Sequence, residues 1–328
     1  MSVLRKIHKG LRVCVALLLV ALALAYGYLL YTPDPELPKL SGQFDNKSIE
    51  HGGLTRTYLL YMPADLKPGA PVVFTLHGSM GNPEQMRVAT GYGFERLADE
   101  HGFAVVYPQG YKNYWNDCRT AAPFETSRLN IDDVGFLRSV IAKLHESILI
   151  DPKRVYAMGI SNGGHMAYRL ALEAPAAFAA VAACAANLPT DANCKCTKSG
   201  KPVSVLIMNG TDDPINPFEG GEVSLFGVGN RGSVLSAWDS YIYFLKLNGL
   251  YLSDVDTAED HARLLANGGM RSHNADNAGS EVALYVVRGA GHVIPQPWWR
   301  YPRLLGFTPK TPNGPEEMWK FFARNALP

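Results

Sequence analysis

The sequence predicts an α/β protein with a mostly parallel sheet that helices cover on both faces, preceded by an apolar N-terminal helix. Short apolar runs of strand length alternate with amphipathic stretches of helix length along residues 51–328. Strands separated by such helices pair in parallel and need helices on both faces of the sheet. An uncharged run over residues 13–31 precedes this pattern, and polar side chains with catalytic chemistry follow three of the predicted strands.

The composition is that of a packed globular protein. Of 328 residues, 47% are hydrophobic, and the formal net charge is +1. Disorder requires few apolar residues and a high net charge, so this class is excluded. With 31 Lys and Arg against 30 Asp and Glu, the chain lacks the basic field that phosphate backbones require, and we expect no nucleic-acid partner.

The first 31 residues differ from this average. The run Val13–Tyr31 contains no charged residue, and its 19 residues are close to the roughly 20 that a helix needs to cross a bilayer. Four basic residues and no acidic residue precede the run, and a basic flank stays in the cytoplasm. They are Arg5, Lys6, Lys9 and Arg12. We therefore expect the rest of the chain to be exported, to the periplasm or the extracellular space.

Two fates of this segment stay open. Ala23-Leu24-Ala25 matches a signal-peptide cleavage site, which would release the chain from Tyr26 onward as a secreted protein. The alternative is an uncleaved anchor, a membrane tether through residues 13–31. The anchor is favoured because the apolar run continues through Tyr28–Tyr31 and exceeds the 7–15 residues of a typical signal-peptide core.

The alternating pattern begins after a Pro-rich linker, residues 32–50. Strands are predicted where short apolar runs end at turn residues. They cover residues 56–61, 71–76, 103–107, 154–158, 178–184, 202–208 and 282–287. Helices are predicted from apolar spacings of three and four and from their start signals. They cover residues 82–100, 131–148, 162–172, 233–247 and 315–325. Residues 248–280 form a polar, Gly- and Asn-rich insertion within a domain that spans residues 51–328.

A G-x-S-x-G motif, Gly159-Ile160-Ser161-Asn162-Gly163, supplies the first catalytic residue. The motif follows the predicted strand 154–158 and precedes the predicted helix 162–172. In this strand–turn–helix setting a serine sits at a strained, exposed corner. We therefore predict Ser161 as the nucleophile, with the backbone N–H of Asn162 as one oxyanion donor.

A serine hydroxyl needs a general base and an acid that orients this base. In this kind of sheet the partners follow in the order serine, acid, histidine, each after a strand. Asp212 and Asp213 follow the strand that ends at Met208, and Asp213 is favoured of the two. His292 follows the strand 282–287 in a Gly-rich loop. The predicted triad is therefore Ser161, Asp213 and His292.

The second oxyanion donor and the substrate pocket are predicted from the positions of residues along the chain. The second oxyanion donor is predicted in the loop His77–Gly81 after the first buried strand, as the N–H of Ser79, with Met80 next. Ligand pockets are mostly apolar, so three tryptophans are candidates for the substrate pocket, with ordinary packing as the alternative. They are Trp115, Trp298 and Trp299.

Four cysteines lie outside the apolar run. In an oxidising compartment this even number predicts two disulfides, with the connectivity left open. They are Cys118, Cys184, Cys194 and Cys196. The sequence shows no Cys or His pairs at zinc spacing, no phosphate-binding Gly loop and no dinucleotide fingerprint, so we expect no metal and no cofactor.

Together these motifs resemble the polyhydroxybutyrate depolymerase and feruloyl esterase group of α/β-hydrolases, over about residues 50–295. The resemblance implies an α/β-hydrolase fold, a secreted carboxylesterase without a cofactor, and the triad above, with Asp213 at the family's Gly-Thr-x-Asp position. The motifs are Leu76-His77-Gly78, Ile131–Phe136, Gly159–Gly164, Gly210–Pro214 and Gly289–His292.

Two departures from the family narrow the expected substrate. Ile294-Pro295 stand where the family commonly has Trp-Pro. Extracellular polymer-degrading members append a linker and a substrate-binding domain, whereas 36 residues follow His292 in this sequence. We therefore expect a soluble ester or a short oligomer, such as a hydroxyalkanoate oligomer or a feruloyl ester, hydrolysed through an acyl-enzyme. The alternatives are an acyltransferase with the same triad and a catalytically silent hydrolase-like binding module.

Overall fold

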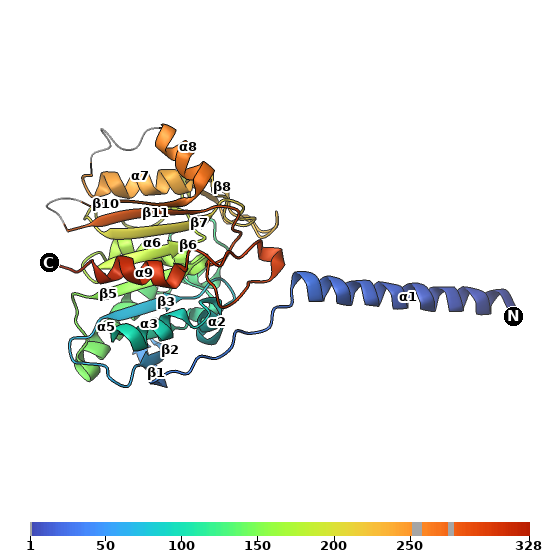
Figure 1. Cartoon of the computed structure of the whole chain (residues 1–328), viewed down its shortest axis with the longest axis horizontal. Coiled ribbons are helices and arrows are strands. Elements are labelled where there is room, and N and C mark those ends of the chain that lie inside the picture. The colour runs from blue at the N-terminus through green and yellow to red at the C-terminus, as the bar shows by residue number, and fades with distance from the viewer. Residues whose placement is uncertain (1, 251–257, 275–278) are drawn as a thin grey trace.

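The computed structural model describes residues 2–250, 258–274 and 279–328. Over these residues one nine-stranded sheet runs through the domain in the order β1-β2-β4-β3-β5-β6-β7-β11-β10 (Figure 1). Six neighbouring strands, from β4 to β11, are parallel, so the predicted mostly parallel sheet is confirmed. The strands are β1 (Gln43–His51), β2 (Leu54–Met62), β3 (Val72–Leu76), β4 (Ala104–Pro108), β5 (Val155–Ile160), β6 (Ala180–Cys184), β7 (Ser204–Gly210), β10 (Gly269–Asn274) and β11 (Glu281–Val287).

Helices cover both faces of this sheet, as predicted. On one face α5 (Asp133–Ile148), α6 (Asn162–Glu173) and α7 (Ala237–Leu247) pack on a core that includes Phe136 and Tyr168. On the other face lies a second core, which includes Phe94 and Phe322. The helices there are α2 (Pro83–Ala89), α3 (Gly93–His101) and α9 (Gly314–Ala323). The smaller elements are α4 (Glu125–Arg128), α8 (Ala258–Asn267), β8 (Gly221–Glu222), β9 (Ser233–Val234), η1 (Tyr111–Asn113), η2 (Asp191–Asn193) and η3 (Arg303–Leu305).

The prediction of a single helix over residues 82–100 is wrong, because the structure has two helices there, α2 and α3. The break follows Thr90, whose hydroxyl donates to the carbonyl oxygens of Met86 and Arg87. Gly91 and Tyr92 then adopt positive φ angles of 60° and 57°, which end α2 and redirect the chain into α3. The helix predicted over 233–247 begins later than expected, at Ala237, because Ser236 accepts a hydrogen bond from Asp239 N and caps it.

Two strands of the nine-stranded sheet lie where the sequence pattern predicted none. Strand β1 occupies the last part of the predicted linker, residues 43–50 of 32–50, and pairs antiparallel with β2 at one edge of the sheet. Strand β10 lies inside the predicted insertion, residues 248–280, and pairs antiparallel with β11 at the opposite edge. Residues 251–257 and 275–278 of that insertion lie outside the described residues.

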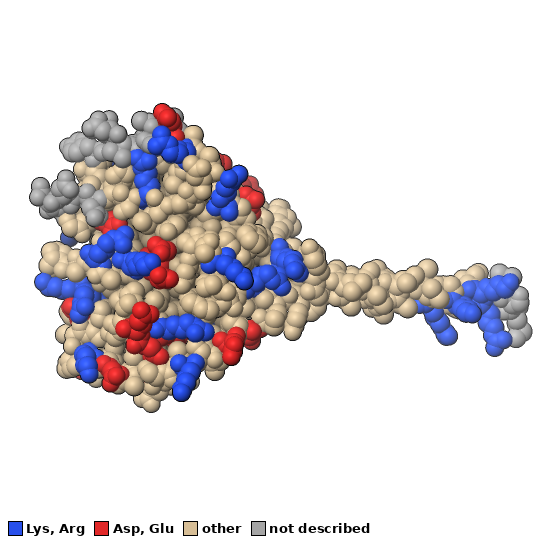
Figure 2. Space-filling view, viewed as in Figure 1, with Lys and Arg blue, Asp and Glu red and all other residues tan. Residues whose placement is uncertain are grey.

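The apolar N-terminal segment forms the helix α1 (Ser2–Leu29), which projects away from the domain (Figure 1). By length and composition, its portion Arg5–Leu29 can cross a membrane. Lys and Arg side chains gather at the free end of this helix, while the stretch toward the domain is uncharged (Figure 2). The predicted N-terminal apolar helix is confirmed.

Candidate active site

Ser161 lies at the sharp turn between β5 and α6, with φ 56° and ψ −121°. The turn is possible because the motif's glycines leave no side chain in its way. A Cβ on Gly163 would lie 2.2 Å from the carbonyl oxygen of Leu76, and one on Gly159 would lie 2.2 Å from that of Gly163. Ser161 N donates to the carbonyl oxygen of Cys184 at 2.9 Å, which ties the turn to the neighbouring strand β6. The sequence therefore fixes Ser161 in a backbone conformation that presents its side chain at the strand end.

His292 and Asp213 meet at the carboxyl ends of the adjacent parallel strands β11 and β7. Nδ1 of His292 donates to Oδ2 of Asp213 at 2.8 Å, and both side chains are buried. Oδ1 of Asp213 accepts from the backbone N–H groups of Ile215 and Asn216, which holds the carboxylate in place. In a neutral imidazole, a proton on Nδ1 leaves Nε2 with a free lone pair.

Asp212 is exposed and has a different role from Asp213. Its Oδ1 accepts a hydrogen bond from the hydroxyl of Thr211, and its backbone N–H donates to the carbonyl oxygen of Ala290. These bonds shape the turn after β7. The structure therefore brings Asp213, and not Asp212, to the imidazole of His292.

Ser161, His292 and Ser79 line one cavity of about 670 Å³. This volume is in the range of small-molecule sites, which is roughly 300–1,000 Å³. The rest of its wall is largely apolar and comes from α2, the β7–α7 connection and the segment after His292. The apolar and aromatic lining residues are Met80, Met86, Val88, Ala89, Tyr92, Ile160, Ile215, Leu225, Trp299, Tyr301, Pro302 and Leu305.

The residues of the two predicted oxyanion donors lie near Ser161. The N–H of Asn162 is at the first position of α6, where the helix itself leaves backbone donors unpaired. The loop that carries Ser79 passes over the serine, because a Cβ on Gly78 would lie 3.5 Å from Cβ of Ser161. The side chain of Asn162 is held by Asp117, whose Oδ2 accepts from Nδ2 at 2.6 Å. This arrangement can direct two backbone donors toward an oxygen bound next to Ser161.

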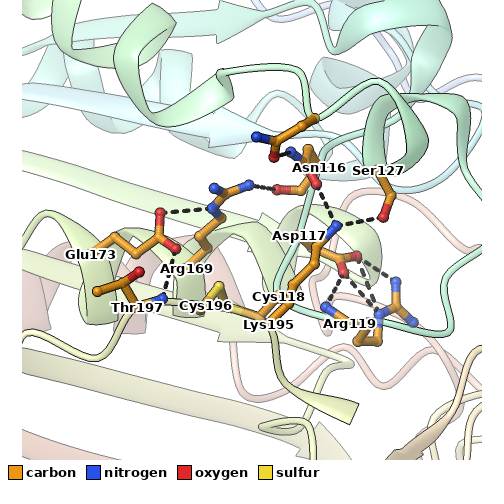
Figure 3. Close-up of a disulfide and its surroundings, with 11 residues drawn as sticks. Asn116, Asp117, Cys118, Arg119, Ser127, Arg169, Glu173, Lys195, Cys196 and Thr197 are labelled. Carbon is orange, nitrogen blue, oxygen red and sulfur yellow. Dashed lines mark hydrogen bonds and ion pairs between the residues drawn. A yellow bond between two sulfur atoms is a disulfide. The ribbon is translucent and has the colours of Figure 1, made fainter.

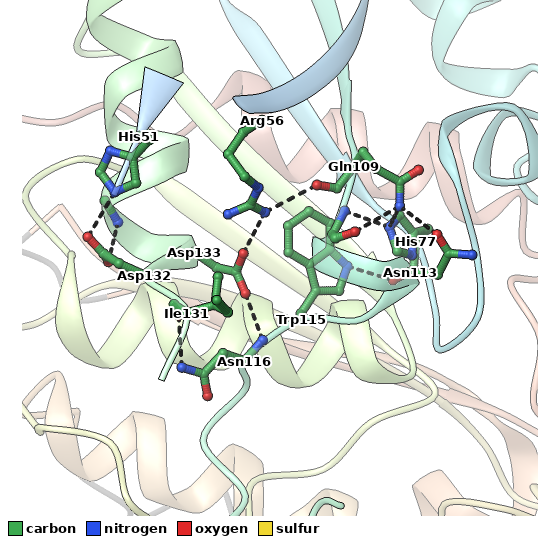
Figure 4. A network of polar contacts seen from close by, with 12 residues as sticks. His51, Arg56, His77, Gln109, Asn113, Trp115, Asn116, Ile131, Asp132 and Asp133 are labelled. Carbon is green, nitrogen blue, oxygen red and sulfur yellow. Dashed lines mark hydrogen bonds and ion pairs between the residues drawn. The ribbon is translucent and has the colours of Figure 1, made fainter. Parts of the chain in front are cut away.

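His77, which Figure 4 shows among Gln109, Asn113 and Trp115, supports the loop that carries Ser79. Its Nε2 accepts from Gly110 N at 3.0 Å, so the proton is on Nδ1, which donates to the carbonyl oxygen of Gly78 at 2.7 Å. Nε1 of Trp115 donates to the carbonyl oxygen of His77 at 2.9 Å. Burial lowers the pKa of His77 to about 4, so the ring is neutral at pH 7. His77 is therefore a support of the loop.

Of the three tryptophans predicted for the substrate pocket, Trp299 lines the cavity and the other two do not. Trp115 is fully buried, because the segment after β4 brings it under the loop that His77 supports. Trp298 lies against Gly93 at the start of α3, with Arg96 over its ring. The pocket assignment was therefore wrong for Trp115 and Trp298.

Sequence reasoning missed several lining residues. Tyr92 reaches the cavity from the break between α2 and α3, and the Thr-Gly-Tyr-Gly stretch at residues 90–93 was the signal for that break. Arg231 also lines the cavity and is half-buried. Burial, and then the nearby Arg119, lower the pKa of Arg231. No sequence pattern marked Arg231, because its loop has neither strand nor helix periodicity.

All five cysteines lie in described residues, and they form one disulfide, Cys118–Cys196. The prediction of two disulfides was wrong, because Cys184 is buried in β6, where its Sγ–H donates to the carbonyl oxygen of Val293. Cys194 is a free, half-buried thiol.

The disulfide joins Cys118 to Cys196 next to Asp117, as Figure 3 shows, and Asp117 accepts a hydrogen bond from the side chain of Asn162. Asp117, next to Cys118, pairs with Arg119, whose Nη2 lies 2.6 Å from Oδ2. Burial alone raises the pKa of Asp117, but Arg119 outweighs this effect and lowers it, so the carboxylate is ionised. Lys195 Nζ donates to Oδ1 of Asn116, which adds a second tie across the disulfide.

Two further carboxylates, Asp132 and Asp133, have structural roles (Figure 4). Oδ1 of Asp132 accepts from Gly135 N and caps α5. Asp133 is buried, pairs with Arg56 at 2.7 Å and accepts from Asn116 N. Within the described residues no group of three or more His, Cys, Asp or Glu side chains is placed to hold a metal ion.

Comparison with known proteins places this chain among esterases. The family model described as "Esterase PHB depolymerase" matches residues 56–201. NocK of Nocardia uniformis subsp. tsuyamanensis, whose name describes it as a predicted esterase, is 31% identical over 85% of this chain and 82% of its own length. Feruloyl esterase C of Emericella nidulans is 28% identical over 51% of this chain and 58% of its length.

The solved structures agree with the fold. The acetyl xylan esterase from Aspergillus awamori superposes with a TM-score of 0.54, over 86% of this chain and 100% of that one. The two sequences are 13% identical, so the likeness concerns the arrangement of sheet and helices.

Proposed function

Because the chain belongs to the esterase family of polyhydroxybutyrate depolymerases and feruloyl esterases, which have the α/β-hydrolase fold, we propose that it is an exported serine carboxylesterase. The observation that supports the serine mechanism is the 2.8 Å hydrogen bond between His292 and Asp213. His292 lines the same cavity as Ser161, whose backbone has a positive φ angle. A nucleophile, its base and an orienting acid are the minimum for acyl transfer through a covalent intermediate.

The first step forms the acyl-enzyme. Nε2 of His292 takes the hydroxyl proton as Oγ of Ser161 attacks the ester carbonyl carbon. The N–H groups of Ser79 and Asn162 stabilise the negative oxygen of the tetrahedral intermediate. The intermediate collapses when His292 passes its proton to the leaving alcohol oxygen. Asp213 stabilises the imidazolium that exists between the two transfers.

The second step releases the acid. His292 removes a proton from water, the hydroxide attacks the acyl carbon, and Ser161 leaves with the proton that His292 returns. Neutral imidazole is needed at the start of both steps, and Asp213 keeps its proton on Nδ1. The mechanism therefore needs no group beyond those of the chain and a water molecule.

The cavity supports an ester with an apolar or aromatic acyl part. Tyr92, Trp299 and Tyr301 line it, and aromatic rings bind flat, apolar groups well. We propose a hydroxyalkanoate oligomer, a feruloyl ester or a similar small ester as the substrate. The relative named feruloyl esterase C and the family model described as "Esterase PHB depolymerase" support these two classes.

We also propose that α1 remains attached as a membrane anchor after export. Its helix continues unbroken through Ala23-Leu24-Ala25 to Leu29, and its basic residues lie at the end away from the domain. A disulfide in the domain supports an oxidising compartment. N-terminal sequencing of the mature protein tests this point, since a chain that begins at Tyr26 would contradict the anchor.

The hydrolase itself is tested with a panel of p-nitrophenyl esters of increasing chain length, together with methyl ferulate and a hydroxybutyrate oligomer. We expect hydrolysis by the wild type, and loss of roughly 10,000-fold or more in kcat for Ser161→Ala. Adding alcohol acceptors separates hydrolysis from acyl transfer, because a transferase gives a new ester in place of the free acid. Undiminished hydrolysis by Ser161→Ala would contradict the proposal.

A further inference from the structure

The cavity mouth lies very close to the domain end of α1. Nε1 of Trp299, a cavity residue, donates to the carbonyl oxygen of Pro33 at 2.9 Å, and Asp34 also lines the cavity. Helix α1 ends at Leu29. Pro33 is four residues after Leu29, and four residues of extended chain reach at most about 14 Å, so the contact of Pro33 with the cavity residue Trp299 lies close to the end of α1.

A second contact joins the end of α1 directly to the domain. Nη1 of Arg303 donates to the carbonyl oxygen of Tyr28 at 3.0 Å, and its guanidinium lies 4.4 Å from the centre of the Tyr28 ring. Arg303 belongs to η3, and Leu305 of the same turn both lines the cavity and accepts the backbone N–H of His292. The last turn of α1 is therefore joined to the element that supports the catalytic histidine.

The residues at this junction are typical of a membrane–water interface. Tyr26, Tyr28 and Tyr31 lie at the domain end of the apolar run, and tyrosines concentrate where a helix leaves the hydrocarbon. Figure 1 shows that α1 leaves the domain on the side where β8 lies, away from the C-terminus. Since β8 follows the carboxyl end of β7, this is the side of the catalytic residues.

Four exposed apolar side chains belong to the two segments that contain the cavity residues Leu225 and Leu305. Val228 is 73% exposed and Phe307 66% exposed. They stand next to the cavity residues Leu225 and Leu305, which pack against one small cluster. We call these four residues the apolar rim: Phe226, Val228, Leu304 and Phe307. Apolar groups that gather around a binding site mark a surface that contacts another apolar phase.

We propose that the apolar rim rests on the outer surface of the membrane that α1 spans, so that the cavity takes its ester substrate from the bilayer. This inference rests on the proposed anchor and deepens the proposed esterase activity by naming its substrate class. The substrate is an amphiphilic ester whose apolar part partitions into the membrane. We infer that a membrane, and not another protein, covers the apolar rim, because the proposed anchor α1 holds this face of the domain next to the bilayer.

Placement is tested first, without any need for activity. The full chain is reconstituted in phosphatidylcholine vesicles that contain phosphatidylglycerol, with and without brominated phosphatidylcholine as a quencher. Val228→Trp adds an emitter to the rim, and Leu149→Trp adds one at an exposed apolar position, 54% accessible, before the amino end of β5. Brominated lipid should quench most of the emission added by Val228→Trp and none of that added by Leu149→Trp. Equal quenching, or protein that does not remain with the vesicles, would overturn the inference.

The substrate class is tested with the same vesicles. The double variant Phe226→Ser/Val228→Ser is compared with Leu149→Ser on a water-soluble ester, p-nitrophenyl butyrate, and on a vesicle-embedded ester, p-nitrophenyl palmitate. The rim variant should lose roughly tenfold or more on the embedded ester while its rate on the soluble ester stays within about twofold. Equal losses on both esters would overturn the proposed substrate class. If neither ester is hydrolysed while the quenching is seen, the esterase proposal fails and the membrane placement stands.

Discussion

Oδ2 of Asp213 accepts a 2.8 Å hydrogen bond from Nδ1 of His292, although 79 residues separate the two in the chain. The contact is formed because β7 and β11 are adjacent and parallel, so that the loops after them meet at one edge of the sheet. It fixes the tautomer that leaves Nε2 free to act as a base. Without this contact, the imidazole of His292 would have no partner to hold its proton on Nδ1.

Replacing Asp213 by Asn should keep the fold and remove the correct tautomer of His292. We expect kcat to fall roughly 1,000- to 10,000-fold, since an amide in this place stabilises neither the tautomer nor the imidazolium. The matched control is Asp212→Asn, because Asp212 is exposed and bonds to Thr211. Steady-state hydrolysis of p-nitrophenyl butyrate measures both. Similar losses in the two variants would show that the acid was assigned wrongly.

Removing the disulfide should destabilise the domain and loosen Asn162. Cys118 and Cys196 are 78 residues apart, and breaking a native disulfide costs about 2–5 kcal/mol in the free energy of unfolding. Cys196→Ala should also lower kcat, because Asp117, which holds the Asn162 side chain, neighbours Cys118. Cys194→Ala is the control, since that thiol is free. Urea unfolding followed by tryptophan fluorescence measures the difference, and equal stability of the two variants would refute the prediction.

Acid should weaken the fold through His77. Burial lowers its pKa from 6.5 to about 4, so between these pH values the unfolded chain binds a proton that the folded chain does not. Stability from this group is therefore complete above pH 6.5 and falls as the pH drops toward 4. Each pKa unit is worth 1.36 kcal/mol, which gives a loss of about 2 kcal/mol by pH 5.

The variant His77→Gln should lose stability less steeply over this pH range than the wild type. His101→Gln, at an exposed position on α3, is the control and should keep the wild-type slope. Urea unfolding at pH 7 and pH 5 measures the slope for each protein. An unchanged slope in His77→Gln would mean that His77 is not the buried neutral group described above.

Substitution of two tryptophans should affect two different properties: Trp115 the stability of the fold, and Trp299 the KM for the ester. Trp115→Phe leaves the carbonyl oxygen of His77 without its buried partner, which costs about 1–3 kcal/mol of stability, and it should leave KM unchanged. Trp299→Ala removes a cavity wall and should raise KM roughly three- to tenfold, since about 1 kcal/mol of apolar contact is lost. Urea unfolding and KM for p-nitrophenyl butyrate are measured for both variants. A raised KM in Trp115→Phe would place that ring in the cavity after all.

The sequence predicted what depends on local pattern. The central strands are short apolar runs, and the residues that follow parallel strands meet at one edge of the sheet. The candidate nucleophile, base and acid could therefore be selected from the sequence. Strand β1 was not predicted, because its sequence, QFDNKSIEH, is mostly polar and lacks the apolar alternation of a half-buried strand. It lies at an exposed edge of the sheet. The positions of Trp115 and Trp298, the buried partner of Cys184, and Arg231 depend on tertiary packing, which no local pattern reports.

Covalent labelling can identify the residue that forms the acyl-enzyme, which we propose is Ser161. The full chain is treated with a fluorophosphonate ester, and the modified residue is identified by mass spectrometry of the peptides. We predict one phosphonylated residue, Ser161, with loss of hydrolysis in proportion to labelling and no labelling of Ser161→Ala. Loss of hydrolysis without a label on Ser161, or a label on another residue that tracks the loss of activity, would contradict the assignment of Ser161 as the nucleophile.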